Sequence, residues 1–173
     1  MVIISVGLLG MAGLQVRMQT LELESYQRSQ ALLLLSDMAN RLSANRTAVL
    51  AGSYDISAAS PVGVGMVCAA LSATPTTVER DRYEWCMGLQ GAAELAGGAG
   101  SASVGAMIGG RGCVENVGGD LMVTVAWQGL TPITAPAASV ACGANNYNAS
   151  SGPCVNDLCR RTVTTLVRIA TLN

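Results

Sequence analysis

The sequence contains no histidine and no phenylalanine, and only two tryptophans and four tyrosines among its 173 residues. Without histidine the chain lacks the usual general base near neutral pH and the commonest metal ligand. Catalytic sites of the Ser-His-Asp or Cys-His kind are therefore excluded, and we expect neither enzymatic activity nor a cofactor. Without phenylalanine, a hydrophobic core must be built mainly from valine, leucine, isoleucine, methionine and alanine.

Charge is also scarce. Charged residues make up 12% of the chain and the net charge is −1. No basic surface is large enough to hold a nucleic acid through its phosphates, so we expect no nucleic-acid partner. The glycine-rich stretch at 91–112 is not followed by the G-K-[S/T] triplet of a phosphate-binding loop, and it is typical of a surface loop.

The cysteines favour disulfide bonds over a metal site, because no two of them have the C-x-x-C spacing of a zinc or redox motif. There are six of them, at Cys68, Cys86, Cys113, Cys142, Cys154 and Cys159. An even number in a loop-rich region indicates an oxidising compartment. We favour a bond between Cys68 and Cys86, and one from Cys159 to either Cys142 or Cys154. We predict no metal site.

The chain opens with sixteen residues that are apolar or small, apart from Ser5 and Gln15. As a helix they would span about 24 Å, which is shorter than the roughly 30 Å hydrocarbon core of a bilayer. Glycines recur every third residue and form a band that lets another helix approach closely. The residues that we expect to pack against other helices are Gly7, Leu8, Leu9, Gly10, Gly13 and Leu14.

The helical pattern then continues through residues 17–52, because no proline occurs before Pro61. Two acid-before-base pairs with a spacing of four, Glu24–Arg28 and Asp37–Arg41, favour a helix. An apolar stripe follows the helical period at Leu21, Leu32, Leu35, Met38, Ala39 and Leu42. We predict one nearly continuous helix, about 75 Å long and ending near Gly52, whose front third is not covered by the rest of the chain.

The remainder, residues 53–173, is expected to form a globular head behind a linker at 51–67. A short helix is predicted at 74–90, with Pro75 at its start and Thr76 or Thr77 as its cap. The alternation in "DLMVTVAWQGL" at 120–130 predicts a strand, and the Thr- and Val-rich segment at 160–172 predicts another. A long, cysteine-stapled loop would join them. The predicted head core comprises Trp85, Val123, Val125 and Trp127.

Four segments carry a resemblance to a known family. "ISVGLLGMAGLQ" and "YQRSQALLLLSDMANRLSANR" near the start, with "VTVAWQG" and "CRRTV" near the end, resemble the minor pilins called type IV pilus modification protein PilV. The match covers both ends of the chain and little of residues 52–118. It implies an α+β, type IV pilin-like fold in which a long N-terminal helix packs on a small antiparallel sheet with disulfide-stapled loops.

The resemblance also implies a function without catalysis. The chain would be a structural subunit of a type IV pilus that primes assembly or forms the tip. Its partners would be other minor pilins and the major pilin. It would lie first in the bacterial inner membrane, with its head in the periplasm, and later in the extracellular pilus.

The sequence departs from this family at its start. Members begin with a short basic leader that ends in glycine, and an acidic residue follows a few positions into the mature helix. Neither feature is present, and Met1 matches a position about nine residues into that helix. We expect a trimmed or partial form of a longer chain, because about nine more apolar residues would give a length that spans a bilayer.

Other readings remain open. The head could be a tip adhesin that binds a surface or another molecule. The chain could also be a pseudopilin of a type II secretion system, although the cysteine-rich C-terminal part argues mildly against that. Finally, a long amphipathic helix with an apolar start can simply be a core helix or a coiled-coil arm.

Overall fold

The computed structural model describes residues 2–91 and 107–170, and of residues 2–9 and 12 it describes the backbone only. The elements in chain order are α1 (Val2–Ala44), α2 (Arg46–Leu50), β1 (Val62–Gly63), α3 (Thr77–Leu89), β2 (Arg111–Val117), β3 (Asp120–Gln128) and β4 (Arg160–Val167). The strands form one antiparallel sheet in the order β1-β2-β3-β4. The α+β class predicted from the sequence is therefore confirmed.

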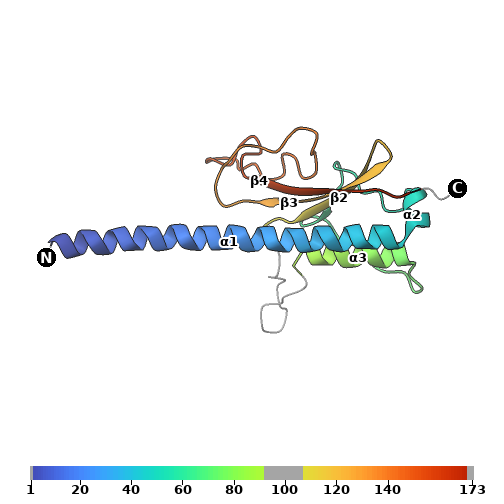
Figure 1. Cartoon of the computed structure of the whole chain (residues 1–173), viewed down its shortest axis with the longest axis horizontal. Coiled ribbons are helices and arrows are strands. Elements are labelled where there is room, and N and C mark those ends of the chain that lie inside the picture. Colours follow the sequence, from blue (N-terminus) through green and yellow to red (C-terminus); the bar gives the residue numbers. More distant parts are fainter. Residues whose placement is uncertain (1, 92–106, 171–173) are drawn as a thin grey trace.

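One long helix organises the molecule. Figure 1 shows α1 running along the sheet, with α3 beside its C-terminal half and its N-terminal half extending beyond everything else. We call residues 53–91 and 107–170 the head. Helix α1 packs against the strands β3 and β4 of the head, while α3 packs against β1 and β2, so the two helices cover one face of the sheet together.

The predicted single helix is interrupted once. Asn45 adopts φ −120° and ψ 58° between α1 and α2, and its side-chain amide donates to the hydroxyl of Tyr54 at 3.1 Å. Asparagine readily leaves helical geometry to make such bonds. The helical region ends near Gly52, as predicted, because Gly52 turns the chain with φ +71°.

The buried face of α1 is narrower than the predicted stripe. It consists of Gln27, Ala31, Leu35, Met38 and Leu42, at helical spacing. Leu21 and Leu32 were expected on it, but they are 67% and 46% exposed. Both positions lie outside the narrow stripe from Gln27 to Leu42, and both are exposed.

Helix α3 packs against α1, and Trp85 makes one of the contacts between them. Its N-terminus has a capping box, in which Thr76 and Glu79 satisfy each other's backbone N–H groups. Trp85 is fully buried, and its indole N–H donates to the carbonyl oxygen of Leu34 on α1 at 2.9 Å. The ring also lies under β2, where a Cβ at Gly112 would collide with the ring and would lie 2.7 Å from Cδ1 of Leu89. Glycine at this position therefore lets the tryptophan fit under the sheet.

Strand β3 forms the middle of the sheet, as its alternation predicted. Leu121, Val123, Val125 and Trp127 are all buried. On the other face of the strand, Thr124 and Ala126 are also fully buried. The loop between β3 and β4 covers them.

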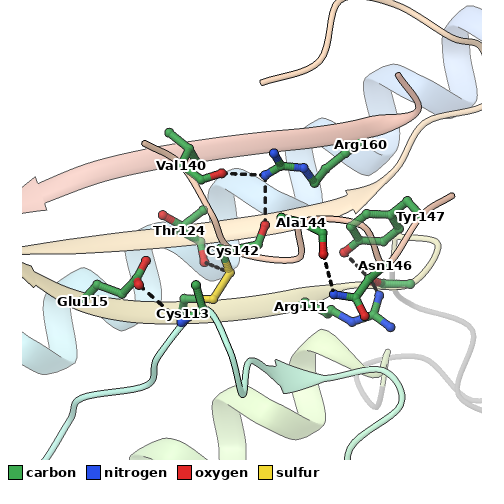
Figure 2. Close-up of a disulfide and its surroundings, with 12 residues drawn as sticks. Arg111, Cys113, Glu115, Thr124, Val140, Cys142, Ala144, Asn146, Tyr147 and Arg160 are labelled. Carbon is green, nitrogen blue, oxygen red and sulfur yellow. Dashed lines mark hydrogen bonds between the residues drawn. A yellow bond between two sulfur atoms is a disulfide. The ribbon is translucent and has the colours of Figure 1, made fainter. Parts of the chain in front are cut away.

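The Cys113–Cys142 disulfide ties this loop to the outer face of the sheet (Figure 2). Ala126, the two cysteines and Tyr147 form a second small core there. The predicted Cys68–Cys86 bond is confirmed. Cys159 pairs with Cys154 rather than Cys142, which settles the open choice.

The sequence patterns did not predict the strands β1 and β2. The last two residues of the predicted loop at 91–112 begin β2, and within the predicted linker Ile56 and Val62 pair with β2. The strand β2 joins β3 through Gly118 and Gly119, both with positive φ, which is typical of a two-residue hairpin. Strand β4 is shorter than expected, ending at Val167.

A polar network joins α1 and α3 near the C-terminus of α1. Arg41 contacts Asp37 at 3.0 Å, as predicted, and also Asp81 and Glu84 on α3. The hydroxyl of Tyr54 donates to the buried carboxylate of Asp81. Burial and this neighbouring carboxylate raise the pKa of Tyr54 to about 12.

We expect Gly112→Ala to destabilise the protein by about 1–3 kcal/mol, the usual cost of overpacking a core. The cause is steric, since the backbone of Gly112 does not have the positive φ that favours glycine. In a Trp85→Leu background the same change should cost clearly less, because the ring that it meets is gone. Urea unfolding of the four proteins measures this coupling; equal costs in the two backgrounds would contradict the proposed contact.

The Tyr54 network predicts a dependence of stability on alkaline pH. A folded-state pKa near 12 against about 10 in the unfolded chain means that the stabilisation is complete below pH 10 and is lost as the pH rises toward 12. Tyr54→Phe should lower stability at pH 7 by about 1–3 kcal/mol, because Asp81 loses a donor. Between pH 10 and 12 the variant should then lose less stability than the wild type. Denaturant unfolding at pH 9 and 11 tests this, and parallel losses would count against it.

Candidate functional site

The part of α1 that the head does not cover, over residues 10–23, is the most unusual surface of the molecule. We call it the exposed half of α1. Its large apolar side chains are more than half exposed, at Met11, Leu14, Val16, Met18, Leu21 and Leu23. A Cβ added at Gly10 or Gly13 would meet nothing within 4 Å. Exposed apolar surface of this extent marks an interaction site in soluble proteins.

These side chains lie on more than one side of the helix. Met11, Leu14, Met18 and Leu21 follow the spacing of a single stripe, whereas Val16 and Leu23 lie on the opposite side. A helix that is apolar on several sides is suited to burial among several neighbours. The sequence-predicted residues Gly10, Gly13 and Leu14 belong to this surface. Gly7, Leu8 and Leu9 lie in α1, but their side-chain surroundings are outside the described residues.

The head first fastens to α1 at Glu24. Its carboxylate accepts a hydrogen bond from the backbone N–H of Leu130 at 3.0 Å and lies 3.3 Å from Nη2 of Arg161. The spacing of Glu24 and Arg28 favoured a helix, which is present, but Glu24 turns toward the head and pairs with Arg161 instead of Arg28. Arg28 is exposed and has no ion-pair partner among the residues that the structure describes. No local sequence pattern indicates this contact, because its partners lie more than 100 positions away.

A groove with a volume of about 550 Å³ lies beside this contact, between α1 and β4. We call it the junction groove. Its lining comprises Glu24, Ser25, Arg28, Trp127, Ile133, Thr134, Pro136, Arg160, Arg161, Thr162 and Val163. Three arginines against one glutamate give it an excess of positive charge. The two tryptophans thus differ, because Trp85 lies wholly inside the core while Trp127, 4% exposed, borders this groove.

A second hollow, of about 360 Å³, lies under the loop closed by the Cys68–Cys86 disulfide. Its lining is mostly apolar and includes Met66, Leu71 and Tyr83. The adjacent Val67 is 95% exposed. This part of the head therefore presents a small apolar patch, distant in sequence from the exposed half of α1.

Comparisons with known proteins found no relative of this chain. No protein-family model matches the chain, and neither curated proteins nor solved structures give a match. Among the residues that the structure describes, no helix combines the length and hydropathy needed to cross a membrane. Within the same residues, no group of three or more acidic or cysteine side chains is arranged to hold a metal ion.

Proposed function

We propose that the chain is a minor pilin, a structural subunit of a type IV pilus that takes part in priming assembly or in forming the tip. The observation that carries the proposal is the exposed half of α1, which continues the core helix of the head and is apolar on more than one side. Within a filament it packs among the helices of other minor pilins and the major pilin.

The physical gain comes from burying this half of α1. Each large apolar side chain, such as Leu14 or Met18, contributes about 1.5–3 kcal/mol when it leaves water completely. Part of that gain offsets the loss of freedom on association. Before assembly the same surface lies in the inner membrane. Because a bilayer and a bundle of helices are both dry, the transfer from one to the other loses little hydrophobic stabilisation.

The three disulfides support an exported location for the head. Such bonds persist in the periplasm and outside the cell and are rare in the cytoplasm. They also close loops around the sheet, which lowers the entropy of the unfolded chain. A head stabilised in this way suits a subunit that is displayed on a filament.

A second function, adhesion at the pilus tip, is favoured by the apolar patch around Val67. An exposed valine beside an apolar hollow is a suitable contact for a surface or another molecule. The two functions are compatible, because one uses α1 and the other uses the head.

The test is incorporation into pili. In a piliated bacterium that expresses the chain, Leu14→Arg should lower its amount in the sheared pilus fraction at least about tenfold, since an unpaired charge in a dry bundle costs more than 1.4 kcal/mol. The melting temperature of the head should not change, because Leu14 is 64% exposed. Val67→Arg, an equally drastic change on the head, should leave incorporation intact.

Normal incorporation of Leu14→Arg would contradict the pilin proposal. If Val67→Arg left incorporation unchanged but abolished attachment of the bacteria to surfaces, the adhesin function would be supported as well.

A further inference from the structure

Strand β4 leaves one edge of the sheet open. Among the described residues it pairs only with β3. The β2–β3 hairpin closes with Val117 opposite Asp120, and such a closing pair exchanges hydrogen bonds. Even-numbered residues of β3 therefore bond to β2 and odd-numbered ones to β4. The bond from the Gly129 N–H to the Cys159 carbonyl continues the same alternation.

The same parity identifies the open groups of β4. Its residues at 161, 163, 165 and 167 stand opposite odd-numbered residues of β3 and are bonded to them. The backbone N–H and C=O groups of Thr162, Thr164 and Leu166 consequently point away from the sheet. No backbone partner reaches them from any residue that the structure describes.

The part of this edge from Thr162 to Val167 lacks the usual protection. From Thr162 to Val167 the strand carries no charge and no proline, and its register with β3 is continuous, without a bulge. Natural proteins normally interrupt or charge exposed edges to prevent another strand from pairing with them. A regular, uncharged edge is therefore suited to receive a strand.

The junction groove lies directly beside this edge, because Thr162 and Val163 form part of its lining. Two of its arginines are already engaged. Arg161 pairs with Glu24, and Arg160 pairs with Asp157 and donates to the carbonyl oxygens of Val140 and Cys142 (Figure 2). Of the three arginines that line the groove, only Arg28 has no ion-pair partner among the described residues. A carboxylate is its natural complement.

We propose that the β4 edge and the junction groove bind an extended, acidic segment of a partner protein. The segment adds a strand beside β4, with its backbone paired to Thr162 and Thr164, and places a carboxylate against Arg28. Backbone pairing supplies affinity and the side-chain contacts supply specificity, as in other cases of strand addition. The proposal does not depend on incorporation of the chain into a pilus.

The first test uses two synthetic peptides, acetyl-Thr-Val-Thr-Glu-Thr-Val-Thr-amide and the same peptide with Lys in place of Glu. The Glu peptide should bind the full chain at least about tenfold more tightly, the effect of one charge-assisted contact. In hydrogen exchange, the amides of Thr162 and Thr164 should gain protection on binding. Those of Val163 and Thr165 should change little, because they are already bonded to β3.

Variants separate the two parts of the proposal. Thr164→Pro removes an outward N–H without touching the bonds to β3, and it should abolish binding. Arg28→Glu should reverse the preference in favour of the Lys peptide. Arg80→Glu, at an exposed position on α3 outside the groove, should change neither. If Thr164→Pro does not fold, a peptide methylated on its backbone nitrogens blocks pairing from the ligand side and should not bind.

Several results would overturn the proposal. They are no binding of either peptide at millimolar concentration, binding that survives both Thr164→Pro and backbone methylation, and an unchanged preference in Arg28→Glu. Equal competition by free acetate would show a simple anion site instead of a strand site, and would also overturn it.

Discussion

The burial of one face of α1 between Gln27 and Leu42 is the interaction on which the rest of the structure depends. The sheet and α3 both pack on this face, and Trp85 joins them by reaching the Leu34 carbonyl of α1 from beneath β2. The same helix continues without interruption into the uncovered apolar half. The orientation of the head relative to the exposed surface is therefore set by one continuous helix, and in the proposed filament the packing of α1 would also fix where the head lies.

The molecule has two surfaces of different chemistry. The exposed half of α1 offers apolar area without hydrogen-bonding specificity. The junction groove and the β4 edge offer directional backbone groups and one unpaired guanidinium. A contact of the first kind gives strong association with many similar helices, whereas a contact of the second kind selects a partner. Glu24 lies at the boundary between them, where it holds the loop after β3 and Arg161 against the helix.

Much of this fold could be predicted from local patterns. The helix α3 followed from Pro75, a capping threonine and an apolar face, and β3 followed from strict alternation. The disulfide between Cys68 and Cys86 was favoured among the possible pairings and is present. These features depend on residues near one another in the sequence. The strand β2 was missed because "RGCVENV" alternates poorly, although the two glycines before β3 indicated a hairpin. The groove and the Glu24 contact depend on residues brought together only by the finished fold, so no local pattern encodes them.

The central claim is that the exposed half of α1 becomes buried when the chain assembles, and native methionines can test it directly. Met11 and Met18 are 61% and 60% exposed, Met66 on the head is 41% exposed, and Met38 is fully buried. Mild peroxide treatment followed by mass spectrometry reports which of them are accessible. In the isolated chain, Met11, Met18 and Met66 should oxidise while Met38 does not. In sheared pili that contain the chain, Met11 and Met18 should become protected and Met66 should stay reactive. Equal oxidation of Met11 and Met18 in both samples would contradict the account.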